Sequence, residues 1–145
     1  MKDLANRRMI KILITLVTIV YGVLPAIADL NETHIYNPEW SPHARVHGVW
    51  FLFFGASMSF MSLYFLWLKD NLFLPIFVGL MFASGFWVAY VTSELYAGAL
   101  VDENGVETRV LGLESNVFVF SVVTIVLLGA LAFAFKNDGL PSDPV

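Results

Sequence analysis

Residues 116–135 read NVFVFSVVTIVLLGALAFAF, and this run decides the class of fold. It contains no charged side chain and matches the roughly 20 residues that an α-helix needs to cross a bilayer. A helix satisfies its own backbone hydrogen-bonding groups, which lipid cannot do. The run therefore predicts a transmembrane helix over residues 116–135.

The composition of the whole chain extends this prediction. Of its 145 residues, 58% are hydrophobic and 14% are charged, whereas ordinary soluble domains have about 25% charged residues. A soluble fold of this size has too small an interior to bury so much apolar surface. No basic patch with interleaved aromatic residues occurs, so we expect no nucleic-acid partner. The absence of cysteine excludes disulfides, thiolate metal sites and thiol catalysis.

Three further apolar runs predict spans over about residues 9–28, 43–68 and 72–95. Together with residues 116–135, they predict an all-α integral membrane protein. We expect a four-helix transmembrane bundle that forms a single domain over residues 1–145. Residues 136–145 contain Gly, Pro and Asp, and we expect them to form a loose tail.

The first apolar run allows a second interpretation. Lys2, Arg7 and Arg8 precede it, and Ala26-Ile27-Ala28 ends it. A basic start, an apolar run and small residues also describe a cleavable signal peptide. We prefer a retained helix, but the pattern itself does not decide between a span and a signal peptide over residues 1–28.

The longest predicted loop, residues 96–114, contains Asn104-Gly105 between two short β-prone segments. Asn-Gly favours the tight turn of a β-hairpin, because both residues tolerate a positive φ. We therefore expect a short extracytoplasmic β-hairpin with strands near residues 99–101 and 106–110.

The positions of Lys and Arg predict the orientation, because these residues are enriched on the cytoplasmic side. Six of them share one side of the predicted bundle, namely Lys2, Arg7, Arg8, Lys11, Lys69 and Lys136. Only Arg45 and Arg109 lie on the other side. We therefore expect cytoplasmic N- and C-termini and, in a bacterium, an inner-membrane protein.

All three histidines fall in residues 33–50, which read THIYNPEWSPHARVHGVW and face outward in this orientation. Ser41 can cap the second predicted helix, and Pro42 suits its first position. His43 and His47 then lie four residues apart on one face of that helix. The helix N-terminus disfavours an imidazolium, which leaves a neutral ring that can bind a metal or accept a proton.

Imidazole and carboxylate side chains from several spans are expected to meet at this outer face. The candidate catalytic residues are His43, His47 and Glu94. The candidate metal ligands are His34, His43, His47 and Glu94, and a divalent zinc, copper or iron ion would suit them. The carboxylates that could complete or orient this set are Asp29, Glu32 and Glu114. Acid–base chemistry without a metal is an alternative, and so is a structural role for these residues where the chain enters the membrane.

The pattern T-H-x-x-N-P-x-W-x-P-H-A-R-x-H over residues 33–47 resembles a signature of small uncharacterised multi-span membrane proteins. The resemblance covers this motif and the four-span arrangement. It implies no activity, cofactor or site residue that can be transferred to this chain.

Two functions fit the sequence. In the first, the His/carboxylate site binds or transforms a hydrophobic molecule that enters from the bilayer, with or without a metal. In the second, the chain is a non-catalytic subunit or assembly factor that packs against a larger membrane complex. The expected partners are a membrane lipid or other hydrophobic small molecule, a membrane protein, or a second copy of the chain.

Overall fold

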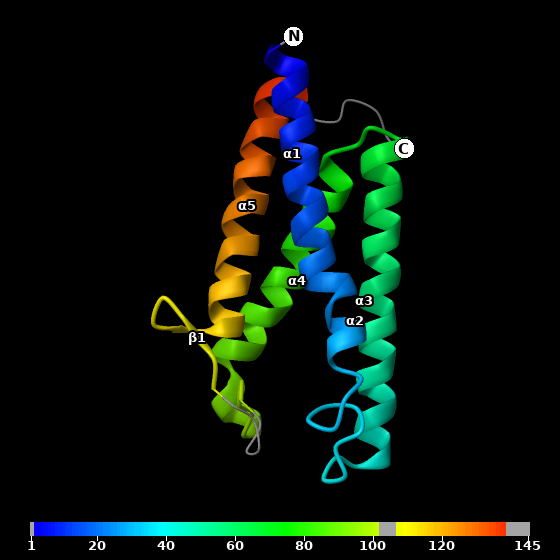
Figure 1. The fold of residues 1–145 in the computed structure, drawn as a ribbon, viewed down its shortest axis with the longest axis vertical. Helices are drawn as coiled ribbons and strands as arrows, with labels where there is room; N and C mark the ends of the chain where they lie inside the picture. Colours follow the sequence, from blue (N-terminus) through cyan, green and yellow to red (C-terminus); the bar gives the residue numbers. More distant parts are fainter. Residues whose placement is uncertain (1, 102–106, 139–145) are drawn as a thin grey trace.

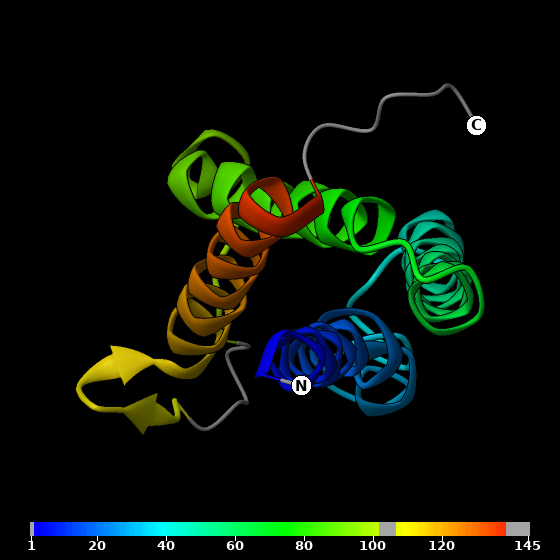
Figure 2. The ribbon, with the colours of Figure 1, turned by 90° about the horizontal axis from the view of Figure 1, so that it is seen from above.

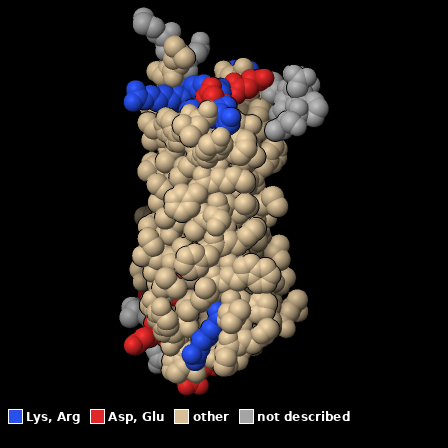
Figure 3. Space-filling view, turned by 90° about the vertical axis from the view of Figure 1, so that its right-hand side faces the viewer, with Lys and Arg blue, Asp and Glu red and all other residues tan. Residues whose placement is uncertain are grey.

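The structure, a computed structural model, describes residues 2–101 and 107–138. Four of its helices are long and apolar enough to cross a membrane: Leu4–Ala28, Pro42–Leu68, Phe73–Val91 and Ser115–Asp138. In Figure 3, a broad band free of Lys, Arg, Asp and Glu separates two ends that carry them. These features agree with the predicted all-helical membrane protein.

Figure 1 shows the order of the elements. The first span comprises α1 (Lys2–Thr18), the π-helix η1 (Ile19–Val23) and α2 (Pro25–Ala28). The next spans are α3 (Pro42–Leu68) and α4 (Phe73–Val91), and the 3-10 helix η2 (Ser93–Tyr96) follows α4. Two short strands, β1 (Arg109–Val110) and β2 (Leu113–Glu114), precede α5 (Ser115–Asp138).

The two ends of the bundle differ, and we name them by their residues. The terminal end is where α1 begins and α5 ends, at the top of Figure 1. The histidine end is where α2 ends and α3 begins, at the bottom of Figure 1. The first and last described residues of the chain therefore both lie at the terminal end of the bundle.

The first span contains a π-helical segment that hydropathy did not predict. Leu24 N donates to the Ile19 carbonyl at 2.9 Å, a spacing of five residues. Pro25 follows and has no backbone N–H to donate. The wider turn therefore lies where the proline interrupts the regular hydrogen bonding of the helix.

The apolar core is divided along the bundle. Near the terminal end, the buried cluster draws on α1, α3, α4 and α5, and Leu66 is its buried α3 residue. Nearer the histidine end, the second cluster contains Tyr21, Ala83, Val123 and Leu127 but no described residue of α3. In Figure 1, α4 starts beside α3 and ends beside α5. Figure 2 shows the same oblique course from above. The inclination of α4 therefore separates it from α3 at the histidine end.

Ion pairs join the helices at the terminal end. Arg7 Nη1 lies 2.6 Å from Asp138 Oδ1, and Arg7 Nη2 lies 3.2 Å from Asp70 Oδ2. Lys11 Nζ lies 2.8 Å from Asp70 Oδ1. These contacts connect α1 to the α3–α4 turn and to the end of α5.

The connections at the histidine end confirm part of the prediction. Ser41 Oγ accepts a hydrogen bond from Ala44 N, and Pro42 occupies the start of α3. A β-hairpin is present, but it pairs Arg109 with Glu114 and Val110 with Leu113. Its turn is Leu111-Gly112, both at positive φ. The predicted strand near residues 99–101 is wrong, because these residues form no strand. The predicted Asn104-Gly105 turn lies outside the described residues.

Candidate functional site

His43 and His47 form a close pair on the first turns of α3. Their Nε2 atoms are 3.1 Å apart, and their ring centroids are 4.6 Å apart. Both side chains are exposed. The structure therefore confirms that these two predicted residues share one helical face.

The nitrogen separation suits two kinds of chemistry. It fits a hydrogen bond between one protonated and one unprotonated ring nitrogen. It also fits two ligands of one metal ion, because bonds of about 2.0–2.1 Å place adjacent nitrogens roughly 3 Å apart. Among the residues that the structure describes, no group of three or more His, Asp or Glu side chains could hold a metal. A metal site that includes His34 and Glu94 stays a prediction.

The other predicted residues lie apart from the histidine pair. His34 is exposed, and its Nδ1 lies 2.9 Å from Thr33 Oγ1. Glu94 is exposed on η2, after the end of α4. Glu32 is exposed in the connection between α2 and α3. Thus only His43 and His47 of the candidate catalytic and metal-binding residues are shown in mutual contact.

Glu114 has a structural role at the start of α5. Its carboxylate accepts hydrogen bonds from Asn116 N at 2.9 Å and Val117 N at 3.0 Å. Partial burial opposes ionisation, but these backbone donors, with Ser115 and the Asn116 side chain, hold the pKa of Glu114 below its usual value. An ionised carboxylate here satisfies amides that the first turn of a helix leaves without partners.

A cavity lies between the helices at the histidine end, where α3 and α4 separate. Its volume is about 810 Å³. The lining side chains come from all four spans and are mostly apolar. They are Val20, Tyr21, Leu24, Pro25, Ala28, Asp29, Phe51, Leu52, Phe54, Met58, Val78, Met81, Phe82, Gly85, Phe86, Ala89, Asn116 and Phe120.

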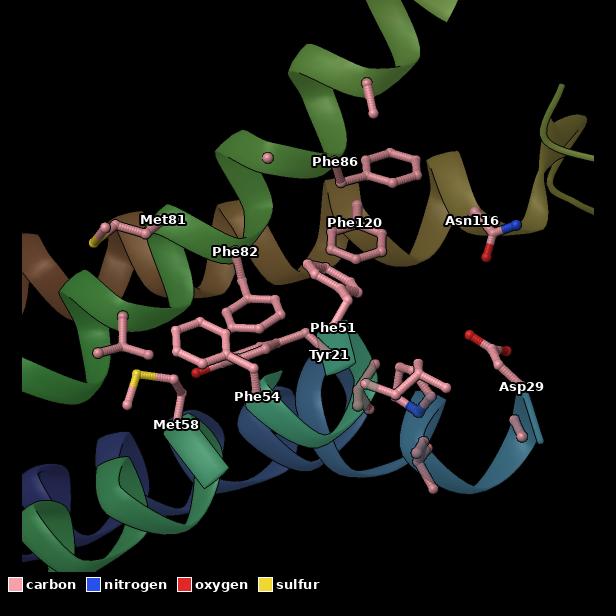
Figure 4. A pocket seen from close by; sticks show the side chains of 18 residues that line it. Tyr21, Asp29, Phe51, Phe54, Met58, Met81, Phe82, Phe86, Asn116 and Phe120 are labelled. Carbon is pink, nitrogen blue, oxygen red and sulfur yellow. The ribbon is translucent and has the colours of Figure 1, made fainter. Parts of the chain in front are cut away.

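Aromatic side chains form much of the cavity wall, and Figure 4 shows them gathered around its middle. Tyr21 stacks on Phe82 with ring centroids 5.2 Å apart. Phe86 stacks on Phe120 at 4.0 Å. Met58 and Met81 lie toward one end in Figure 4, and their flexible side chains can adapt to a bound shape.

The polar end of the cavity, which we call the mouth, is formed by Asp29 and Asn116. Figure 4 shows their side chains facing each other, away from the aromatic cluster. Asp29 follows α2 directly and is half-buried. Burial raises the pKa of Asp29, although attraction to His34 acts in the opposite direction. The mouth thus adds a partly desolvated carboxyl group to an otherwise apolar cavity.

The predicted histidine pair is related to this cavity by helical spacing. Neither His43 nor His47 lines the cavity. However, His47, Phe51, Phe54 and Met58 follow one another at intervals of three or four residues, which places them on one face of α3. The pair therefore continues the cavity-lining face toward the histidine end.

Four hydroxyl groups lie buried beside the cavity without hydrogen-bond partners among the described residues: Thr18, Tyr21, Ser59 and Ser62. The Tyr21 hydroxyl faces those of Thr18 and Ser62 but does not reach bonding geometry with either. Several other hydroxyls in the spans bond to their own helix, for example Ser57 Oγ to the Phe53 carbonyl at 2.8 Å. The cluster therefore has unused capacity to bind a water or another oxygen atom.

Sequence reasoning gave Asp29 only a supporting role and missed Asn116 and the aromatic wall. The sequence feature that could have indicated the aromatic wall is the spacing of aromatic residues on α3 and α4. Phe51 and Phe54 lie three residues apart, and Phe82 and Phe86 lie four apart. The same spacing is equally compatible with core packing or lipid contact, so it could not locate a cavity by itself.

The four apolar helices and the cavity define a small helical protein with the proportions of an integral membrane protein. The chain belongs to a family described as "Family of unknown function (DUF6640)", whose model matches residues 13–137. No curated protein and no solved structure matches the chain. Membership agrees with the predicted uncharacterised family, and it supplies no activity.

Proposed function

We propose that this protein binds one hydrophobic, membrane-derived molecule in the cavity between its helices. The cavity itself is the observation that carries this proposal. Its volume of about 810 Å³ lies within the roughly 300–1,000 Å³ typical of small-molecule sites. Aromatic and aliphatic side chains provide a large apolar surface, and two polar side chains at one end would fix the ligand's orientation.

The packing of the helices supports entry from the bilayer. Ion pairs hold α1, the α3–α4 turn and α5 together at the terminal end. At the histidine end, α3 contributes no described residue to the apolar cluster that joins the other spans. A lipid-sized molecule would enter between α3 and α4 and place its polar end at the mouth.

The histidine pair would lie beside the polar end of the bound molecule. His47 is one helical turn from the cavity-lining Phe51. This placement supports the hypothesis that the pair takes part in binding or in acid–base chemistry. A metal at the pair is a further hypothesis, since the geometry supplies two nitrogen atoms at a suitable separation.

The proposed orientation places the histidine end outside and both termini in the cytoplasm of a bacterial cell. It rests on the excess of Lys and Arg at the terminal end. Because the chain has no cysteine, single-cysteine variants can test it. A membrane-impermeant maleimide should label exposed Leu95→Cys on intact cells and Leu4→Cys only after lysis. The reverse labelling pattern would overturn this orientation.

Two glycines provide a matched test of binding. Gly85 lines the cavity, Gly129 does not, and a Cβ atom added to either meets no atom within 4 Å. A phenyl group at position 85 would occupy the cavity, whereas one at position 129 would not. We expect native mass spectrometry to show a lipid-sized molecule on the parent and on Gly129→Phe, but much less of it on Gly85→Phe.

The magnitude follows from the displaced apolar surface. If a Phe side chain removes about 100 Å² of ligand contact, the loss is about 2.5 kcal/mol, or about 70-fold in affinity. Equal occupancy in both variants would contradict binding in this cavity. A parent that binds no such molecule but copurifies with a membrane protein would instead favour the subunit hypothesis.

A further inference from the structure

The mouth of the cavity identifies the chemical class of its ligand. We propose that the ligand is a long-chain amine, whose protonated nitrogen binds between the Asp29 carboxylate and the Asn116 side-chain oxygen. Its hydrocarbon part would occupy the aromatic cavity. This inference rests on the proposed function, because it concerns the ligand of the same cavity.

Asp29 is an acid without a bonded partner. Among the described residues that line the cavity, only Asp29 carries a charge. Within the described parts of the chain, its carboxylate accepts no hydrogen bond and forms no ion pair, and its charge interaction is with His34. A half-buried carboxylate is stabilised when a cationic donor replaces the water that burial removes. The mouth therefore favours a ligand that brings a positive charge.

The orientation of Asn116 adds a second acceptor. Its Nδ2 donates to Glu114 Oε1 at 3.0 Å. The opposite amide orientation would set two acceptor oxygens against each other, so this bond fixes which amide atom faces the mouth. Figure 4 shows the Asn116 oxygen directed toward the Asp29 carboxylate. A group placed between these two acceptors must donate hydrogens, and an ammonium group offers up to three.

The described arginines of the histidine end do not line the cavity. Arg45 Nη2 donates to the Pro38 carbonyl at 3.3 Å, and Arg109 pairs with Glu107 at 2.6 Å. A phosphate or carboxylate head group at the mouth would therefore meet the Asp29 charge without a neighbouring Lys or Arg to offset it. This arrangement disfavours anionic lipids.

The proposal can be tested with a saturated amine, alcohol and carboxylic acid of equal chain length. Each competes with the others for the purified protein in mild detergent, and native mass spectrometry measures the bound fraction of each. We expect the amine to bind about tenfold more tightly than the alcohol, because an ammonium group adds a positive charge to the hydrogen bond with the Asp29 carboxylate, whereas a hydroxyl is a neutral donor. The acid should bind most weakly.

Variants locate the source of this preference. Asp29→Asn keeps the shape of the side chain but removes its charge. This variant should still bind the alcohol, and it should bind the amine no more tightly than the alcohol. Glu32→Gln is the matched control, because Glu32 is exposed and does not line the cavity, and it should behave like the parent. Asn116→Leu should weaken amine binding by a smaller factor.

The outcomes separate this inference from the proposed function. Binding of all three molecules without preference for the amine, or an unchanged preference in Asp29→Asn, would overturn the amine proposal and leave the cavity function intact. If none of the three molecules binds the parent, the proposed function itself fails. These comparisons begin with the parent protein, so they remain decisive even if a variant does not fold.

Discussion

Gly22 determines how closely the first span approaches α3, and replacing it with alanine tests that packing directly. The glycine is buried in η1. An added Cβ atom would lie 1.7 Å from Ser59 Oγ, 3.0 Å from Ser59 Cβ and 3.2 Å from the Gly55 carbonyl oxygen. Rotation of the serine hydroxyl relieves only the first contact. The other two would require the helices to move apart.

Overpacking of this kind typically costs about 1–3 kcal/mol. We therefore expect Gly22→Ala to lower the free energy of unfolding by about that amount and the unfolding temperature by roughly 3–10 °C. Gly129→Ala is the control, because its added Cβ atom meets no atom within 4 Å. Alanine favours helix over glycine by about 0.5–1 kcal/mol, so the control should be neutral or more stable.

A second-site change identifies the clash. Gly22→Ala combined with Ser59→Gly removes both serine atoms that the new methyl group would meet. The double variant should therefore be more stable than the sum of the two single changes implies. Circular dichroism during heating in mild detergent would compare the parent, both single variants and the double variant. If Gly22→Ala unfolds at the same temperature as Gly129→Ala, close packing at Gly22 is not what holds the first span against α3.

Two further predictions concern charge and metal binding. The hydrogen bond from Lys11, with help from Arg7, lowers the pKa of Asp70 in the folded protein. The stabilisation that the Asp70 carboxylate provides should therefore be complete above the pKa of about 3.9 that Asp has in an unfolded chain. It should disappear as the pH falls through the lower pKa of Asp70 in the folded protein. Because the Asp70 side chain is 63% exposed, Asp70→Asn should lower the free energy of unfolding by only about 1 kcal/mol or less near neutral pH. Unfolding temperatures of the parent and the variant, measured across pH, should become equal in acid. The metal hypothesis for the histidine pair can be tested by elemental analysis of protein purified without a histidine tag. We expect zinc, copper or iron in the parent and less of it in His43→Ala and His47→Ala. A metal-free parent would contradict the hypothesis.

The spans were predictable because bilayer thickness and backbone hydrogen bonding leave few structures for a long apolar run. The predicted start of the second span, residue 43, is one residue from Pro42. The third span was predicted to reach residue 95, but α4 ends at Val91 and a 3-10 helix covers Ser93–Tyr96. Hydropathy reports where polar residues begin, but it does not distinguish hydrogen bonds of different spacing. For the same reason it missed the π-helical turn before Pro25.

Local chemistry of the histidine stretch was predictable, whereas contacts between spans were not. Ser41 caps α3 as expected, and the four-residue spacing brings His43 and His47 together. Glu94 was expected to approach them because both segments end at the same membrane face. Figures 1 and 2 show that α4 is instead inclined away from α3 as it reaches this end of the bundle. The crossing angle depends on the side chains packed between two helices, and residue spacing along one helix does not specify it.

The distribution of polar contacts explains why the cavity is open at the histidine end. In the described parts of the chain, the ion pairs between different spans or their connections involve Arg7 and Lys11, both at the terminal end. At the histidine end, Asp29 follows the first span, Asn116 lies in the first turn of α5, and the two side chains face each other as acceptors. Two acceptors cannot bond to each other, so they do not draw the first span and α5 together. A donor placed between them would do so, which means that the same ligand group that the mouth selects would also strengthen the packing of the helices around it.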